Sequence, residues 1–223
     1  MPQGHSSPHS CKVVVLISGS GSNLQALIDA QKAGALPIDI VGVISNRPDV
    51  LGLERARNAN IPTSLLDHKT FNNRQDFDHA LAKLIEQYQP DLLVLAGFMR
   101  ILTPEFTQQY QGKMLNIHPS LLPKYQGLHT HQRALEAGDD KHGVTVHFVT
   151  AELDGGPSIV QAIVAIAPSD DETSLAKKVQ AQEHVIYPMA VKWFAEGRLQ
   201  MVSNKTILDG EPLPQNGYQV DAR

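Results

Sequence analysis

An amide, an imidazole and a carboxylate stand out among the residues of this chain that could do chemistry. Asn116 and His118 lie at the end of the apolar run "KMLNI" at 113–117, and Asp154 lies in "ELDGGP". Residues i and i+2 of an extended chain project to the same side, so we expect Asn116 and His118 on one face. An amide and a protonated imidazole can stabilise an oxyanion, and a carboxylate can hold the imidazolium or accept a proton. The set predicts direct transfer of an acyl group between two bound substrates.

The same side chains also permit plainer interpretations. No G-x-S-x-G sequence provides a nucleophile, and Cys11 begins the first apolar run, at the wrong end of that strand. His118 could be a polar residue satisfied at a strand end, and an aspartate before two glycines is typical of an ordinary turn. A metal site is a further alternative, with possible ligands His118, His129, His131, His147 and Asp154. We expect no metal, because the i, i+2 spacing in "HTH" does not suit a helix.

A glycine-rich loop, "ISGSGSN" at 17–23, joins the first apolar run to a helical pattern. Backbone N–H groups at such a helix start can hold an anion. A dinucleotide site is disfavoured, because Leu24 replaces the third glycine of G-x-G-x-x-G and the second run ends in "SNRP" without an acid. The loop therefore predicts either a phosphate site with Gly21, Ser22 and Asn23 as donors, or a tight structural turn.

The elements that must position these residues alternate between strands and helices. Short apolar runs without alternation predict buried parallel strands at 12–19, 38–46 and 90–98, with shorter ones at 63–67 and 113–117. Helical spacing predicts helices at 22–34, capped by Ser22, at 71–89, and at 103–110, capped by Thr103. This order predicts an α/β fold with a doubly wound, mostly parallel sheet.

The pattern changes after residue 140. "GVTVHFV" and "SIVQAIVAI", joined by a glycine-rich turn, predict antiparallel strands. A long helix is expected over 172–195, with Pro188 inside it and a buried stripe of Leu175, Val179, Ile186 and Trp193. A small hairpin should follow. We expect a flexible tail at 1–11, a single domain at 12–210 and a C-terminal tail at 211–223.

Composition excludes several classes of protein. The 223 residues carry a formal net charge of −4, so we expect small-molecule substrates and no nucleic acid. No apolar run reaches the ~20 residues of a membrane span, and we expect no membrane association. The single cysteine excludes an internal disulfide and a cysteine-rich zinc site, which agrees with a cytoplasmic location.

Six segments in fixed order resemble the folate-dependent phosphoribosylglycinamide formyltransferases, in their stand-alone, monofunctional form. They are "VLISGSGSNLQALIDA", "SNRPDVLGLERA", "LAGFMRIL", "LNIHPSLLPKYQGLHTHQRALEAGD", "GVTVHFVTAELDGGP" and "QEHVIYP", and the resemblance runs from about Lys12 to Tyr218. It implies a Rossmann-like formyltransferase fold. It also implies transfer of a formyl group from 10-formyltetrahydrofolate to the amine of glycinamide ribonucleotide in purine synthesis.

The resemblance assigns roles to matching residues. It makes Asn116, His118 and Asp154 catalytic, and places the ribonucleotide at Gly21, Ser22, Asn23, Gln180 and Glu183. It places the folate at Arg74, Met99, Arg100, Ile101 and Leu102. Two positions depart from the family pattern: Ser20 replaces an asparagine, and Gln126 replaces a proline, which should loosen a loop at the edge of the site.

Rival functions remain open from sequence. The same triplet could hydrolyse formyltetrahydrofolate or formylate methionyl-tRNA, although the extra domains those enzymes carry have no room here. A non-catalytic phosphate-binding module would need the glycine loop but not the triplet. An NAD-dependent oxidoreductase is disfavoured by Leu24. We expect a monomer or a homodimer.

Overall fold

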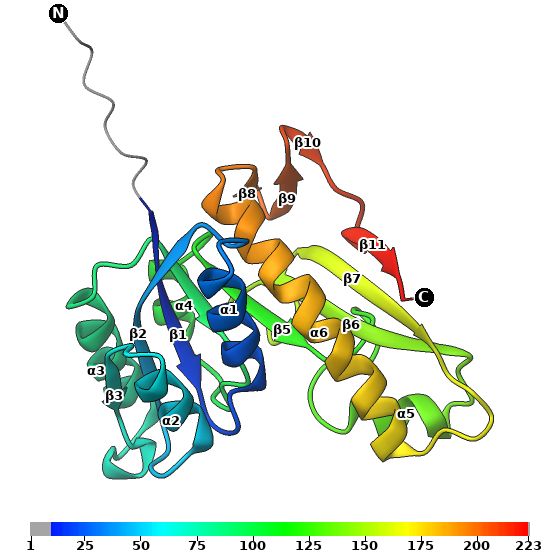
Figure 1. The fold of residues 1–223 in the computed structure, drawn as a ribbon, viewed down its shortest axis with the longest axis horizontal. Coiled ribbons are helices and arrows are strands. Elements are labelled where there is room, and N and C mark those ends of the chain that lie inside the picture. Colours follow the sequence, from blue (N-terminus) through cyan, green and yellow to red (C-terminus); the bar gives the residue numbers. More distant parts are fainter. Residues whose placement is uncertain (1–9, 223) are drawn as a thin grey trace, which may run out of the picture.

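An eight-stranded sheet forms the centre of the molecule (Figure 1). The computed structural model describes residues 10–222. The strands lie in the order β11-β7-β6-β5-β4-β1-β2-β3. Their bounds are β1 Cys11–Ile17, β2 Ile38–Ser45, β3 Thr63–Leu65, β4 Leu92–Leu95, β5 Met114–His118, β6 Lys141–Phe148, β7 Ser158–Ala165 and β11 Tyr218–Asp221.

Strand direction changes where the sequence pattern changes. The strands β3, β2, β1, β4 and β5 pair in parallel, whereas β6 is antiparallel to both β5 and β7. The prediction of a mostly parallel sheet with antiparallel strands after residue 140 is confirmed. Because β5 and β6 are antiparallel, Asn116 lies opposite His147 in the register of the two strands.

Helices cover both faces of the sheet (Figure 1). Helices α1, α2 and α6 pack on one face, and α3 and α4 pack on the other. The helical elements are α1 Ser22–Lys32, α2 Leu51–Asn58, the 3₁₀ turn η1 His68–Thr70, α3 Arg74–Glu86, α4 Pro104–Gln109, α5 Thr130–Glu136 and α6 Glu172–Ala195. Within residues 10–222, none of these helices is both long and apolar enough to cross a bilayer.

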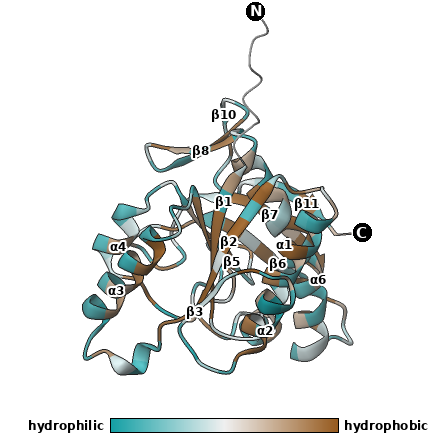
Figure 2. Cartoon of the chain, turned by 60° about the vertical axis from the view of Figure 1, so that its left-hand side comes forward, coloured by the Kyte–Doolittle hydropathy of each residue, from teal (hydrophilic) through white to brown (hydrophobic). Residues whose placement is uncertain are grey.

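The continuous apolar run of β1 is explained by burial on both faces. Val13, Val15 and Ile17 belong to the core beneath α1 and α6, whereas Val14 and Leu16 belong to the core beneath α3. All five side chains are fully buried. Figure 2 shows the hydrophobic residues concentrated on the central strands and the polar residues on the outer sides of the helices. In a strand that is buried on both faces, apolar residues do not alternate with polar ones.

Helix starts follow local chemistry. The hydroxyl of Thr103 accepts from the N–H of Phe106, and Pro104 is the first residue of α4, as predicted. The prediction that Ser22 caps α1 is wrong. Ser22 is the first helical residue, and the cap position is Gly21, which has φ 70°. On α6, the predicted residues Leu175, Val179 and Ile186 are buried, but Trp193 is only partly buried.

The C-terminal region differs from the predicted tail. The expected hairpin is a three-stranded antiparallel sheet of β8 Leu199–Val202, β9 Lys205–Leu208 and β10 Glu211–Pro212. The strand β11 then pairs in parallel with β7, and Tyr218 packs edge-on against Trp193. The prediction of a C-terminal tail at 211–223 is therefore wrong for the residues that form β10 and β11. Of the predicted N-terminal tail, residues 1–9 lie outside the described residues, and Cys11 is a buried residue of β1.

Candidate active site

The carboxyl ends of β1, β4 and β5 meet along one edge of the sheet. Asn116 and His118 are on β5, which pairs with β4. The glycine loop follows β1, and the segment Met99–Leu102 follows β4. Asp154 is in the connection from β6 to β7. Loops at the carboxyl ends of parallel strands are where α/β folds bind their ligands.

His118 and Asp154 form a buried pair. The distance from His118 Nδ1 to Asp154 Oδ2 is 3.4 Å, and each side chain is 8% exposed. The other ring nitrogen, Nε2, lies 2.8 Å from the carbonyl oxygen of Tyr125, to which it donates. An acceptor therefore faces each ring nitrogen, and only the imidazolium form carries a proton on both.

A short segment around Gln126 holds Asp154 in place. The N–H of Gly127 donates to Asp154 Oδ2 at 2.9 Å. The side-chain amide of Gln126 donates to the carbonyl oxygens of Leu153 and Asp154, at 3.2 and 3.4 Å. Asp154 itself has φ 49°, an unusual backbone conformation for a residue with a side chain. The expectation that Gln126 loosens this loop is not supported, because its side chain ties the loop to the Asp154 turn.

Asn116 is oriented by His147, whose role the sequence reasoning missed. The amide nitrogen of Asn116 lies 3.2 Å from His147 Nε2, and His147 Nδ1 lies 2.9 Å from its acceptor, the carbonyl oxygen of Phe148. Burial lowers the pKa of His147 to about 4, so Nε2 is an acceptor at neutral pH. Asn116 therefore gives one amide hydrogen to His147 and keeps a second. The register of β5 against β6 is the signal that could have identified this contact.

The glycine loop has a backbone that requires glycine. Gly21 has φ 70°, and a Cβ atom there would come within 2.6 Å of the Cα of Gly52. The helix α1 starts at the next residue, so the N–H groups of Ser22 and Asn23 belong to its first turn. The predicted phosphate donors are thus placed at the start of an eleven-residue helix.

Helix α6 brings the predicted ribonucleotide residues to this loop. Gln180 Nε2 donates to Ser22 Oγ at 3.3 Å, and Asn23 Nδ2 donates to Glu183 Oε2 at 2.8 Å. Burial raises the pKa of Glu183. The side-chain oxygen of Asn23 is buried and has no hydrogen-bond partner among the described residues.

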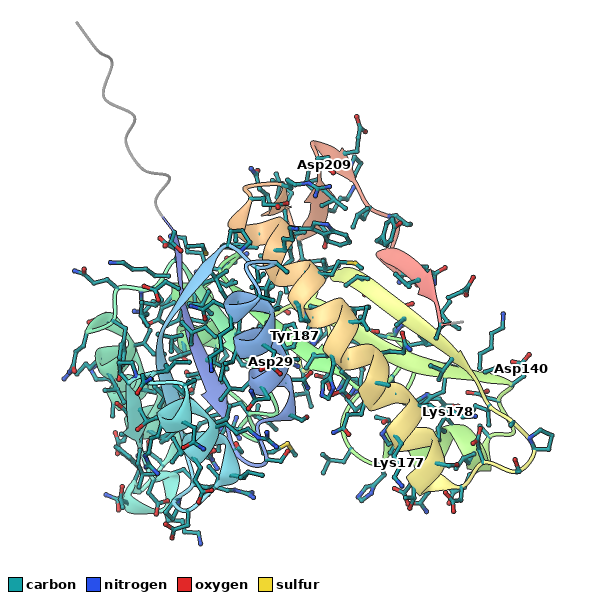
Figure 3. All side chains as sticks on the ribbon, in the orientation of Figure 1. Asp29, Asp140, Lys177, Lys178, Tyr187 and Asp209 are labelled. Carbon is teal, nitrogen blue, oxygen red and sulfur yellow. The ribbon has the colours of Figure 1, made fainter. Side chains whose placement is uncertain are left out.

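Tyr187 fixes α6 against the centre of the sheet. Figure 3 shows Tyr187 between α6 and the strands. Its hydroxyl lies 2.8 Å from the carbonyl oxygen of Leu95 on β4 and 3.0 Å from that of Leu115 on β5. Because Tyr187 is fully buried, this contact fixes α6, and with it Gln180 and Glu183, relative to Asn116.

The predicted folate residues form an irregular segment after β4. Met99 and Ile101 are 54% and 50% exposed, whereas Leu102 is buried. The guanidinium of Arg100 lies 5.4 Å from the centre of the Phe77 ring. Arg74 is exposed at the first position of α3, and no contact joins it to the other predicted folate residues among those that the structure describes.

Three of the side chains weighed as metal ligands lie near one another: His118 Nδ1 and His147 Nε2 lie 3.4 and 3.9 Å from oxygens of Asp154. His131 Nδ1 lies 3.1 Å from His142 Nε2, whereas His147 is engaged with Asn116. Over residues 10–222, no group of three or more histidine, cysteine, aspartate or glutamate side chains has an arrangement that could hold a metal ion.

Comparisons with known proteins identify the family of this chain. The formyl transferase family matches residues 11–191. Over 209 residues the chain is 55% identical to the phosphoribosylglycinamide formyltransferase of Escherichia coli K12, covering 94% of this chain and 99% of that protein. The phosphoribosylglycinamide formyltransferase structure from Coxiella burnetii superposes with a TM-score of 0.92 at 53% identity, over 95% and 99% of the two chains. A formyltetrahydrofolate deformylase from Pseudomonas putida KT2440 has a TM-score of 0.80 at 30% identity, over 91% and 71%. The chain belongs to the formyl transferase family.

Proposed function

We propose that Asn116, His118 and Asp154 transfer a formyl group from 10-formyltetrahydrofolate to the amine of glycinamide ribonucleotide. The chain is a formyl transferase of purine biosynthesis, and its family uses this folate as co-substrate. The observation that carries the assignment to residues is the convergence of an amide, an imidazole and a carboxylate beside the glycine loop. The proposal includes small-molecule substrates only and a cytoplasmic location.

The amide and the imidazole would act on the oxygen of the formyl group. When the neutral amine attacks the formyl carbon, that oxygen gains negative charge. The second amide hydrogen of Asn116 has no acceptor among residues 10–222 and can donate to it. His118 can donate through Nδ1, because its 3.4 Å separation from Asp154 is longer than an ordinary hydrogen bond.

The carboxylate of Asp154 would stabilise the charge on His118 and accept the proton of the amine. It faces His118 and so stabilises the imidazolium that donates to the oxyanion. As the new bond from the amine nitrogen to the formyl carbon forms, the amine loses one proton, and Asp154 accepts it directly or through water. The bond from the formyl carbon to N10 of the folate then breaks, and N10 leaves with one proton. Protons therefore balance over the transfer.

The ribonucleotide would lie between the glycine loop and α6. The first turn of α1 offers the N–H groups of Ser22 and Asn23 to a phosphate. Gln180 and Glu183 already contact these two residues, and Glu183 offers an acceptor to a ribose hydroxyl. The unpartnered oxygen of Asn23 also fits a ligand that brings a donor.

The folate would lie along Met99–Leu102. Two half-exposed apolar side chains, Met99 and Ile101, suit one flat face of a pterin. Backbone groups of Arg100, Ile101 and Leu102 receive no backbone hydrogen bond from any described residue, so they are available to the polar edge of such a ring. The exposed Arg74 suits the charged glutamate end of the folate.

An absorbance assay tests the proposed function. The protein is mixed with 10-formyltetrahydrofolate in the presence and absence of glycinamide ribonucleotide. We expect formation of tetrahydrofolate only when the ribonucleotide is present. The similarity to a deformylase makes hydrolysis the specific alternative, and turnover at an equal rate without the ribonucleotide would establish that alternative instead.

A further inference from the structure

The segment that follows β4 has almost no backbone support of its own. Ala96 donates to the carbonyl oxygen of Leu16 at 2.9 Å, and regular structure resumes only at Pro104, where α4 begins. Among the described residues, no backbone group pairs with the backbone of residues 97–102. A loop whose backbone groups are unpaired would ordinarily sample many conformations. A ligand that forms hydrogen bonds with those backbone groups needs the loop to keep one conformation.

Two side chains from other elements hold the two ends of Met99–Leu102. Ser18, directly after β1, accepts from the N–H of Met99 at 2.8 Å. Asp78, on α3, accepts through Oδ2 from the N–H of Thr103 at 2.6 Å. Ser18 and Asp78 are each 3% exposed. Both acceptor side chains are therefore buried, and they hold the segment from two directions.

Ser18 is itself held in place. Its hydroxyl donates to the side-chain oxygen of Asn46, which is 1% exposed and follows β2. His68 Nδ1 in turn lies 2.9 Å from the carbonyl oxygen of Asn46. The acceptor for Met99 is thus fixed by residues that follow β1 and β2, rather than being a freely rotating hydroxyl.

The buried carboxylate of Asp78 should lower the stability of the fold, which packing alone does not explain. Its second oxygen, Oδ1, is buried and has no hydrogen-bond partner among residues 10–222. Burial raises the pKa of Asp78, against the lowering effects of the Thr103 N–H and of the Arg100 and Arg74 charges. A buried carboxylate with an unsatisfied oxygen destabilises a fold, and such costs are typical of functional positions.

We propose that Asp78 and Ser18 are positioning residues for the folate, holding Met99–Leu102 at both ends so that its free backbone groups keep one conformation. The inference rests on the proposed folate site. The side chains of Asp78 and Ser18 make no hydrogen bond to the described residues proposed to bind the ribonucleotide, so their removal should weaken folate binding selectively. Neither takes part in the chemical step.

The test compares folate and ribonucleotide parameters in Asp78→Ala, Asp78→Asn and Ser18→Ala. For Asp78→Ala we expect KM for 10-formyltetrahydrofolate and the calorimetric Kd of tetrahydrofolate to rise about tenfold. KM for the ribonucleotide and kcat should stay within about twofold. Asp78→Asn keeps an oxygen acceptor for Thr103 and should recover to within about threefold of the wild type.

Asp91→Ala is the matched control. Asp91 also accepts a backbone N–H through a carboxylate oxygen, that of Lys12 at 2.8 Å, but at the opposite end of the strands. It should leave the Kd of tetrahydrofolate unchanged. A folded Asp78→Ala with unchanged folate binding, or with equal rises in both KM values, would overturn the proposal. If Asp78→Ala does not fold, Ser18→Ala decides by the same criterion.

A separate variant distinguishes this inference from the folate placement itself. Ile101 is half-exposed, so Ile101→Asp should fold. If Ile101→Asp leaves tetrahydrofolate binding intact, the folate site is elsewhere and the proposed placement fails. If Ile101→Asp weakens binding but Asp78→Ala and Ser18→Ala do not, the placement stands and the positioning role is wrong.

Discussion

The two ring nitrogens of His118 have different neighbours, and these neighbours bear on the proposed chemistry. It combines a carbonyl acceptor at Nε2, the oxygen of Tyr125, with a carboxylate acceptor at Nδ1, from Asp154. A neutral ring would leave one of these acceptors facing a lone pair. The proposed mechanism uses this arrangement, with Nδ1 as the ring position that donates to the oxyanion.

The types of residue at this site could be predicted from sequence, but their supporting contacts could not. The chemistry and strand-end positions of Asn116, His118 and Asp154 predicted that they would lie together, and the structure does pair His118 with Asp154. Their catalytic role stays a prediction. His147 was considered only as a metal ligand. Its contact with Asn116 depends on the register between β5 and β6, which composition and periodicity do not determine.

Gln126 gives a prediction at this scale. Gln126→Ala removes the donors to the carbonyl oxygens of Leu153 and Asp154, and each such bond contributes about 0.5–1.5 kcal/mol. We expect kcat to fall roughly three- to tenfold because Asp154 becomes less well ordered. Steady-state kinetics with both substrates saturating measure this effect.

Gln132→Ala is the control for that change. Gln132 also loses a side-chain hydrogen bond, to Glu136 within α5, but it does not reach the Asp154 turn. Its kcat should stay within twofold of the wild type. Equal effects of the two substitutions would show that Gln126 has no specific role in holding the turn.

At the scale of elements, strands with two buried faces were the easiest to predict. The run "VVVLI" at 13–17 is apolar at every position because β1 contributes side chains to both cores. The long helix α6 was equally clear, since Leu175, Val179 and Ile186 follow helical spacing. These elements are defined by local pattern, and their burial confirms it.

Elements with weak local patterns were missed. The strand β11 is only "YQVD", with three of its four residues exposed, and its position depends on pairing with β7. Its Gln219 reaches Gln161, whose amide donates to the carbonyl oxygen of Leu122 in the loop after β5. Short edge strands gain their stability from tertiary pairing rather than from sequence propensity. The predicted C-terminal tail was wrong for this reason.

At the scale of the whole molecule, buried histidines link stability to pH. Burial lowers the pKa of His142 and of His147 to about 4, from an ordinary value of 6.5. In the unfolded chain these histidines therefore become protonated below about pH 6.5, whereas in the folded protein they stay neutral until the pH falls to about 4. The stability from each neutral histidine is fully present above pH 6.5 and is lost as pH falls, by up to about 1.4 kcal/mol per pH unit.

His142→Gln tests this link. Two acids with raised pKa values, Asp78 and Glu183, act in the opposite direction, so a variant is compared with the wild type. His131 lies 3.1 Å from His142 and burial lowers its pKa too, so the variant reports on this pair of histidines. Urea unfolding at pH 7, 6 and 5 should show that the wild type loses stability faster than His142→Gln. Parallel losses in the two proteins would contradict the assignment to the pair of His131 and His142.

The most direct test of the account is the single-turnover rate of formyl transfer in Asp154→Asn. Both substrates are saturating, and ribonucleotide binding is measured separately by calorimetry. The substitution keeps the shape of the side chain but removes the charge that faces His118 and the site that accepts the proton. We expect the rate to fall at least about 100-fold, with ribonucleotide affinity retained. A rate near that of the wild type would contradict the proposal that the convergence of Asn116, His118 and Asp154 performs the transfer.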